Sequence, residues 1–115
     1  MKKVIAKLLM SMGMSPHYKG FTYLVHIISL VVANDNVLSN VHKELYPAVG
    51  EEFSVPPGNV ERCIRTAINK FWEEGDLEIA TKIFGEHQKN CPSNSKFIAT
   101  VSQYLLINEN LFKNT

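Results

Sequence analysis

The hydrophobic positions of this chain recur at intervals of three and four residues, which is the spacing of amphipathic helices. No segment alternates apolar and polar residues over the length of a strand. The apolar stripes predict helices over 4–12, after Gly20 to about Asn34, over 38–45, from Pro47, over 58–74, over 77–84, and from 95 to about 107. We therefore expect an all-α fold, organised as one compact domain of about six helices, with five to seven as the range.

Capping residues mark several of the expected helix ends. Gly75 is placed to end the 58–74 helix as a C-terminal glycine cap, and Gly85 to close the next helix. Asp76 is a natural N-cap for that next helix. Asn94 or Ser95 is expected to cap the final helix in the same way.

Residues 46–65, YPAVGEEFSVPPGNVERCIR, match the spacing of a helix-turn-helix, in which two helices are joined by a short turn. Gly50 supplies the small residue that allows the two helices to approach each other. Ser54 stands at the turn, where Gly or Asn is preferred. The apolar anchor positions of the motif are occupied by Val49, Phe53, Val55, Val60 and Cys63. We expect the motif to extend over about residues 46–74.

The second helix of this motif carries a polar side that would face outward. Because Val60 and Ile64 point to the core, the polar residues between them are directed away from it. In a helix-turn-helix this part of the second helix enters the major groove of DNA. Arginine can bind O6 and N7 of guanine with two hydrogen bonds, and a carboxylate can accept from the amino group of cytosine. The candidate base-reading residues are Glu61, Arg62 and Arg65, and those expected to meet sugar and phosphate are Thr66, Asn69 and Lys70.

An ordinary solvated helix would explain the same charges. Glu61 and Arg65 are four residues apart, so they can form a surface ion pair worth about 0.3–0.5 kcal/mol. Such a helix requires neither Gly50 nor a turn before it. The upstream spacing therefore favours DNA binding over the simpler interpretation.

Composition limits the other functional classes. The net charge is only +1, so a strong overall attraction to nucleic acid is excluded, although residues 1–34 carry four lysines and no acid. That stretch allows a local basic surface, for which a solvated chain end is the simpler explanation. Cys63 and Cys91 lack metal or redox spacing, and the histidines are scattered. We expect no metal, no cofactor and a reducing cytoplasm.

Membrane and enzyme classes find no support in the sequence. The apolar run at 27–33 is too short to cross a bilayer, and no cleavage pattern follows the N-terminal residues. No His, Cys or Ser lies in a nucleophile–base arrangement, and no glycine-rich phosphate loop is present. We expect a protein that is not an enzyme and does not bind membranes.

Four segments resemble the C-terminal effector domain of the master sporulation response regulator of endospore-forming bacteria. They are HYKGFTYL (17–24), KELYP (43–47), VERCIRTAI (60–68) and PSNSKFIATVSQ (92–103), and the resemblance extends over residues 5–107. It implies a six-helix domain that binds short GTCGA-containing boxes upstream of promoters, with Glu61, Arg62 and Arg65 at matching recognition positions. It also implies double-stranded DNA as partner, two copies on tandem boxes, and contact with the sigma subunit of RNA polymerase.

The chain departs from this family at the start of the recognition helix. Asn59 stands where relatives usually carry arginine, and Thr66 where they carry histidine. The loss of one cation near the DNA backbone should weaken binding and lower its salt dependence by about one phosphate contact. The segment Pro56-Pro57-Gly58 also removes two backbone N–H groups that could hold a phosphate. Asn59 therefore completes the list of candidate DNA-binding residues.

Two further departures leave a second function open. The loop after Gly85 is shorter than in the family, where this region contacts the sigma subunit, and the family's phosphorylatable receiver domain is absent. The initial Met-Lys-Lys favours a complete chain, with an excised effector domain as the alternative, and in either case we expect residues 1–115 to form a single DNA-binding domain without a receiver. The alternative is a receiver-free interaction module that modulates a full-length regulator or RNA polymerase.

Overall fold

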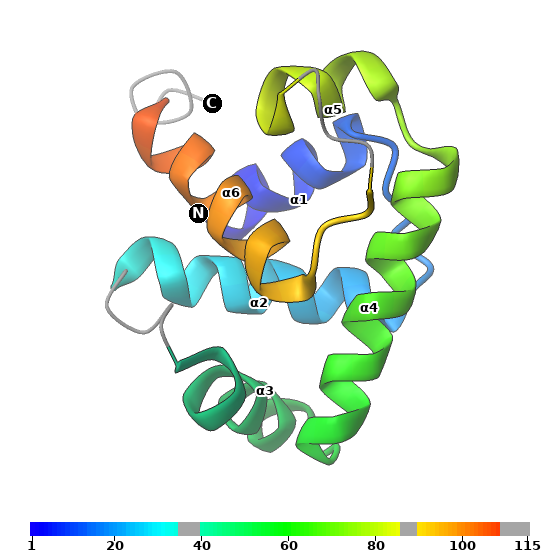
Figure 1. Cartoon of the computed structure of the whole chain (residues 1–115). Coiled ribbons are helices and arrows are strands. Elements are labelled where there is room, and N and C mark those ends of the chain that lie inside the picture. Colours follow the sequence, from blue (N-terminus) through cyan, green and yellow to red (C-terminus); the bar gives the residue numbers. More distant parts are fainter. Residues whose placement is uncertain (35–39, 86–89, 109–115) are drawn as a thin grey trace.

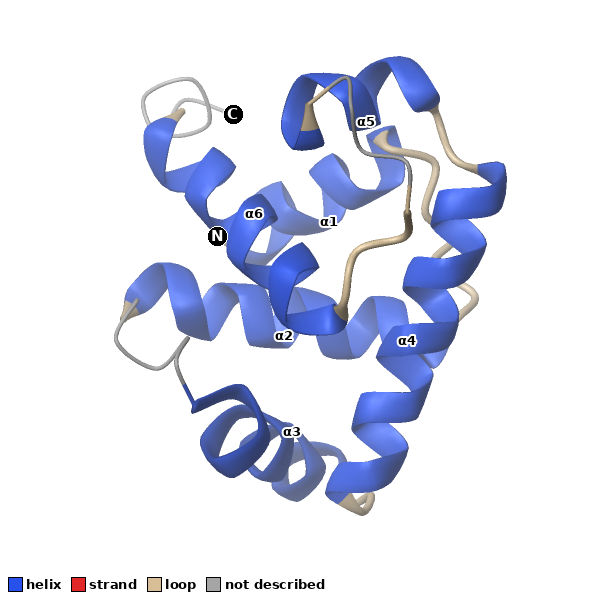
Figure 2. Cartoon of the chain, viewed as in Figure 1, coloured by secondary structure: helices blue, strands red, loops and turns tan. Residues whose placement is uncertain are grey.

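The part of the chain that the structure describes folds into helices only (Figures 1 and 2). This computed structural model describes residues 1–34, 40–85 and 90–108. Its elements are α1 (Lys2–Ser11), α2 (Lys19–Ala33), a π-helix η2 (Val41–Leu45), α3 (Tyr46–Phe53), α4 (Pro57–Glu74), α5 (Leu77–Phe84) and α6 (Asn94–Ile107). The expected all-α class and the expected number of helices are confirmed.

Helix α2 lies at the centre of the domain, where it contacts α1, α3, α4 and α6 (Figure 1). A helix that is apolar around most of its circumference is usually buried on several sides. The buried residues of α2 fit this rule: Gly20, Phe21, Tyr23, Leu24, Ile27, Ile28 and Val31. The radius of gyration of 13.2 Å is that of a single compact domain of this length, for which about 13 Å is expected.

Gly20 lies where α2 crosses α4. A Cβ atom at this position would overlap the backbone carbonyl of Cys63 and lie 2.9 Å from the Cβ of Ala67. Helix α2 begins at Lys19, so Gly20 lies inside the helix, and the expectation that the helix follows Gly20 is wrong. Gly20 allows α2 and α4 to pack closely and does not interrupt α2.

Gly75 follows the last residue of α4, but not as a left-handed cap. Gly75 is the C-cap of α4, as predicted, and its N–H bonds to the carbonyl oxygen of Phe71, but its φ of −76° and ψ of 179° are extended. A Cβ atom here would lie 2.5 Å from the ring of Phe71 and 2.8 Å from the carbonyl oxygen of Met12. The next residue, Asp76, donates its backbone N–H to that same oxygen at 2.8 Å. Gly75 is therefore required by the close approach of the end of α1 to the α4–α5 junction.

The caps of α5 agree with the sequence. Asp76 Oδ1 accepts from the backbone N–H groups of Glu78 at 3.0 Å and Ile79 at 3.3 Å, which confirms Asp76 as the N-cap. Gly85 ends the helix with a φ of 93°, a conformation that glycine adopts readily. Both ends of this helix are thus fixed by local chemistry.

The cap of α6 differs from the prediction. Ser93 Oγ accepts from the backbone N–H of Lys96 at 3.1 Å, so Ser93 is the N-cap. Asn94 and Ser95 both lie inside the first turn of α6, so the predicted position of the cap is wrong by one or two residues. The displacement matters because it frees the side chain of Asn94 for contacts outside its own helix.

The segment before α3 is only partly as expected. Of the helix predicted over 38–45, residues 41–45 form η2, whereas 38 and 39 lie outside the described residues. Leu45 has helical φ and ψ, so η2 continues directly into α3, and Pro47 lies in the first turn of α3. No helix of the described residues has the length and apolar character needed to cross a bilayer.

Candidate nucleic-acid interface

Helices α3 and α4 form a corner joined by a three-residue turn, residues 54–56 (Figure 1). Ser54 has a left-handed backbone, with φ 57° and ψ 45°, and Val55 donates its N–H to the carbonyl oxygen of Gly50 at 2.9 Å. Ser54 is the one non-glycine residue with positive φ in the described chain. The two helices and the turn predicted from residues 46–74 are present.

Gly50 is required at this corner, although by a different contact from the one expected. A Cβ atom would lie 2.5 Å from the carbonyl oxygen of Val55 and 3.5 Å from the nitrogen of Pro57. These atoms belong to the turn and to the first residue of α4. The small residue therefore makes room for the turn that returns from α3 to α4.

The predicted apolar anchors of the motif are buried or half-buried except for one. The anchors that are buried or half-buried, as predicted, are Val49, Val55, Val60 and Cys63. Phe53 remains 37% exposed, and its ring packs against Tyr23 at 5.2 Å and His26 at 5.6 Å between centroids. The anchor prediction for Phe53 is wrong because its ring lies against α2 and not inside the corner.

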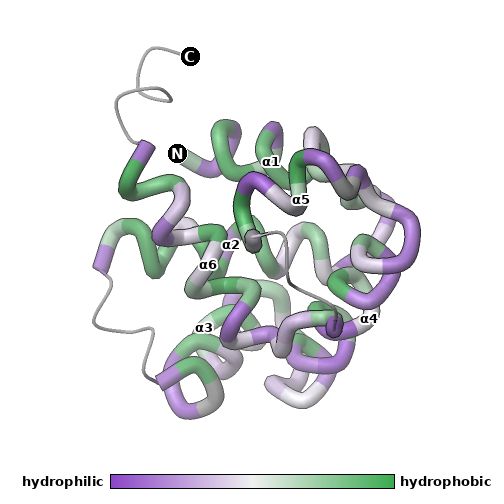
Figure 3. The backbone as a smooth tube through the Cα atoms, turned by 45° about the horizontal axis from the view of Figure 1, so that its top comes forward, coloured by the Kyte–Doolittle hydropathy of each residue, from purple (hydrophilic) through white to green (hydrophobic). Residues whose placement is uncertain are grey.

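Helix α4 has one buried and one exposed side, and Figure 3 shows both hydrophobic and hydrophilic residues along it. The buried side consists of Val60, Ile64, Ala67, Ile68 and Phe71. At 3.6 residues per turn, Arg62 and Asn69 point opposite to that side. Glu61 and Arg65 form one edge of the exposed side, and the other edge consists of Asn59, Thr66 and Lys70. All the candidate residues thus lie on one helix, with Asn59 and Glu61 half-buried and the others exposed.

Arg62 is held by its neighbour on the preceding turn. Its Nη2 donates a hydrogen bond to Asn59 Oδ1 at 2.5 Å. Asn59 lies one turn before Arg62 in α4. In this chain the residue contributes no charge, and its side chain orients the guanidinium of Arg62.

Glu61 and Arg65 form the ion pair that the solvated-helix alternative predicts. Arg65 Nη1 lies 3.3 Å from Glu61 Oε1, with side-chain exposures of 57% and 28%. A pair this exposed contributes about 0.3–0.5 kcal/mol, which a stronger bidentate contact would exceed. The pairing is therefore compatible with both interpretations of the helix.

Lys70 also has partners on its own helix. Its Nζ lies 3.7 Å from Glu74 Oε1 and 4.0 Å from Glu73 Oε2. These pairs are exposed and hence weak in water. They nevertheless reduce the positive charge that the C-terminal half of α4 presents.

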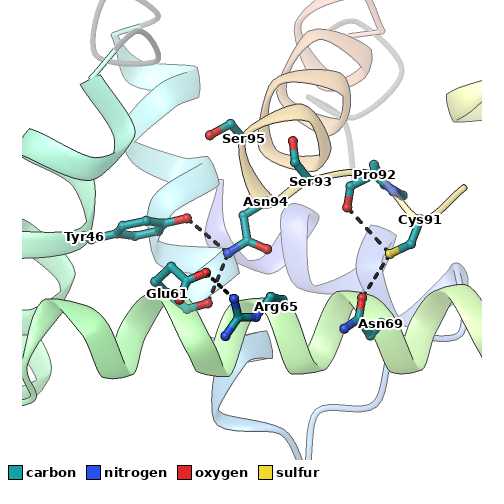
Figure 4. A pocket seen from close by; sticks show the side chains of 9 residues that line it. All are labelled: Tyr46, Glu61, Arg65, Asn69, Cys91, Pro92, Ser93, Asn94 and Ser95. Atoms are coloured by element: carbon teal, nitrogen blue, oxygen red, sulfur yellow. Dashed lines mark hydrogen bonds and ion pairs between the residues drawn. The ribbon is translucent and has the colours of Figure 1, made fainter.

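Asn94 connects the start of α6 to both helices of the corner (Figure 4). Its Nδ2 donates to the hydroxyl oxygen of Tyr46 and to the backbone carbonyl of Glu61, each at 3.1 Å. Burial raises the pKa of the Tyr46 hydroxyl, against the opposing effect of this hydrogen bond. Sequence reasoning missed Asn94 and Tyr46, although both lie in segments that carry the family resemblance.

A pocket of about 270 Å³, lined mainly by polar residues, opens between α4 and the start of α6 (Figure 4). Cys91 lines it and donates its thiol to Asn69 Oδ1 at 3.2 Å. Burial, with a smaller effect of the Glu73 carboxylate, raises the pKa of the Cys91 thiol and so favours this protonated donor. Asn69 is therefore attached to the segment before α6, a contact that the sequence did not predict.

Replacing Asn94 by alanine is expected to lower the free energy of unfolding by about 1–3 kcal/mol, because two partly buried hydrogen bonds are lost. Urea denaturation followed by circular dichroism measures this change. Ser95→Ala alters an exposed residue of the same helix turn and serves as the matched control. Equal stability of the two variants would show that Asn94 does not fasten α6 to the corner.

Among the described residues, no group of three or more His, Cys, Asp or Glu side chains is arranged to hold a metal ion. A family model described as "Sporulation initiation factor Spo0A C terminal" matches residues 5–105. The matched range begins inside α1 and ends inside α6, so it includes the α3–α4 corner and the pocket beside it.

Proposed function

Because the chain belongs to the family of the C-terminal domain of the sporulation initiation factor Spo0A, a family of DNA-binding domains and not of enzymes, we propose that it is a sequence-specific transcription regulator of the sporulation type. In this proposal residues 58–74 of α4 lie in the major groove of short GTCGA-like boxes in double-stranded DNA. The observation that carries the proposal is the exposed polar side of α4 directly after the α3–α4 corner.

Three residues in the first half of α4 are proposed to read bases. Arg62 and Arg65 are exposed and can each bind O6 and N7 of a guanine, while Glu61 can accept from a cytosine amino group. The weak Glu61–Arg65 pair can be exchanged for base contacts at little cost. The G·C pairs of a GTCGA core provide the matching donors and acceptors.

The remaining candidates are proposed to position the helix on the DNA backbone. Thr66, Asn69 and Lys70 lie further along the exposed side and would meet sugar and phosphate. The start of α4 offers few backbone donors for a phosphate, since Asn59 and Val60 both direct their N–H groups to the carbonyl of Pro56. Binding should therefore depend strongly on side chains, with Asn59 acting through Arg62.

Two finer proposals follow from the family. Two copies would occupy tandem boxes, and the sigma subunit of RNA polymerase would contact the region after Gly85. The shortened loop of that region includes residues 86–89, which lie outside the described residues. The proposal of DNA binding does not depend on either of these contacts.

A second candidate is an interaction module that modulates a full-length regulator or RNA polymerase. The observation in its favour is that the charges of α4 have partners within the helix. Arg62 is bonded to Asn59, Arg65 to Glu61, and Lys70 to two glutamates. With a net charge of only +1, such a surface would attract DNA weakly.

A gel-shift titration separates the two candidates. We expect a GTCGA-containing duplex to be retarded in low salt at micromolar protein or below, as specific binding requires. No retardation under these conditions would favour the interaction module. Selection of bound sequences from a random duplex pool should then recover a G·C-containing core, and the same selection with Arg65→Ala should lose the preference at one base pair.

A further inference from the structure

An open groove lies between α1, α2 and the C-terminal end of α3. Its volume is about 300 Å³, and no residue of α4 lines it. The apolar part of its wall consists of Ala6, Phe21, Val25 and Phe53. The groove is thus separate from the surface proposed to bind DNA.

Phe53 gives this groove an aromatic wall that is held in place. Phe53 is 37% exposed as a residue, while Tyr23 and His26 pack against its ring. Keeping apolar surface in water is unfavourable by about 25 cal/mol per Å². A side chain inserted beside Phe53 would remove that exposed surface from water without requiring the ring to move.

Two ammonium groups border the same groove. Lys2 and Lys3 line it, and Lys2 Nζ donates to His26 Nδ1 at 3.0 Å, which places the Lys2 charge next to the aromatic wall. Burial and then the Lys2 charge lower the pKa of His26, which keeps the ring neutral as an acceptor, whereas Glu52 raises it. Residues 1–34 contain no acid, so no carboxylate of α1 or α2 neutralises these lysines.

We propose that this groove binds a peptide segment of a partner protein, one that presents a bulky apolar side chain flanked by Asp or Glu. The apolar side chain would lie between Phe53 and Val25, and the acidic groups would pair with Lys2 and Lys3. Exposed ion pairs add at most about 1 kcal/mol each, so the buried side chain provides the affinity and the charges select the partner. The inference goes beyond DNA binding and does not depend on it.

Selection from a random peptide display library, with the full chain as the target, tests this proposal. We expect enriched peptides to carry Phe, Leu, Ile or Trp next to acidic residues. Thr22 lines the groove and is exposed, so Thr22→Arg blocks the groove without removing a buried contact. Fluorescence anisotropy should show about tenfold weaker binding of an enriched peptide to this variant, a difference of about 1.4 kcal/mol.

Charge reversal provides a second, independent variant. The double variant Lys2→Glu/Lys3→Glu should weaken the same peptide by about tenfold. The matched control is Lys7→Glu/Lys43→Glu, which changes the net charge equally at exposed lysines outside the groove. That control should bind the peptide like the unmodified protein.

Several results would overturn the proposal. Failure to enrich any peptide, enrichment of basic peptides, or peptides that bind Thr22→Arg normally would each do so. A dimer in sedimentation velocity that Thr22→Arg dissociates would show that the occupant is a second copy of the chain. A loss of DNA affinity in Lys2→Glu/Lys3→Glu, with peptide binding unchanged, would assign the two lysines to DNA. Absence of any gel shift, in contrast, would contradict only the proposed DNA binding.

Discussion

Arg62→Ala is expected to weaken binding to a GTCGA-containing duplex by about 1–3 kcal/mol, or roughly 5- to 150-fold. Arg62 lies at the centre of the exposed side of α4, within the part of the helix that reaches base edges in a helix-turn-helix. Its guanidinium donates one exposed hydrogen bond to Asn59 Oδ1, which can be exchanged for base contacts at little cost. The truncation should also relax the preference at one base pair.

Titration of the specific duplex and of a random duplex, both by gel shift at fixed salt, measures these two effects. Lys70→Ala is the matched control, because Lys70 is proposed to meet phosphate. That variant should weaken both duplexes similarly and lower the slope of log affinity against log salt by about one. An equal loss on both duplexes for Arg62→Ala would remove Arg62 from the base-reading residues.

Asn59 is the polar partner of Arg62 on the preceding turn of α4. A second arginine at position 59 would add charge for a phosphate. Asn59 adds none, but its side-chain carbonyl oxygen accepts a hydrogen bond from the guanidinium of Arg62 at 2.5 Å. With a net charge of only +1 the whole chain attracts DNA weakly, so we expect its binding to depend on base contacts.

The local features of α4 and α5 could be predicted from sequence because their causes are local. The buried stripe of Val60, Ile64 and Phe71 follows from the 3.6-residue period alone. Asp76 caps α5 through its own side chain and the two following N–H groups. The same helical period assigns the candidate residues of the interface to one exposed side of α4 without any knowledge of tertiary contacts.

Contacts between segments distant in sequence could not be predicted in this way. Asn94 bonds to Tyr46 and to the backbone of Glu61, which are 48 and 33 residues away. Nothing in the local pattern around Asn94 distinguishes a helix cap from a tertiary bridge. The shift of the cap to Ser93 is the structural reason why this amide is free to reach the corner.

Glycines show the same division between local and tertiary causes. Gly85 has a positive φ and ends its helix, which the sequence predicted correctly. Gly20 is predicted to lie just before its helix and Gly75 at the end of α4, yet both have neighbours that leave no room for a Cβ atom. A glycine near a helix end has the same appearance in sequence whether it serves the turn or the packing of another segment.

Gly20→Ala is expected to lower the free energy of unfolding by about 3 kcal/mol, at the upper end of the usual cost of overpacking. The new methyl group would overlap the backbone carbonyl of Cys63, which cannot turn aside as a flexible side chain can. Helix α2 would have to move away from α4, and α2 also contacts α1, α3 and α6. The higher helix propensity of alanine, about 1 kcal/mol, offsets only part of this cost.

Gly58→Ala makes the same chemical change in α4, where no atom outside the glycine's own surroundings lies within 4 Å of the added Cβ. This variant should be as stable as the unmodified chain, or more stable by up to about 1 kcal/mol. Urea denaturation of the two variants side by side therefore isolates the effect of the α2–α4 crossing from that of helix propensity. Since α2 supports the buried side of α4, Gly20→Ala should also reduce DNA binding although Gly20 lies on the inner side. Equal denaturation midpoints for the two variants would show that α2 and α4 can move apart at little cost in stability. The crossing would then hold α4 in place less firmly than the close packing at Gly20 implies.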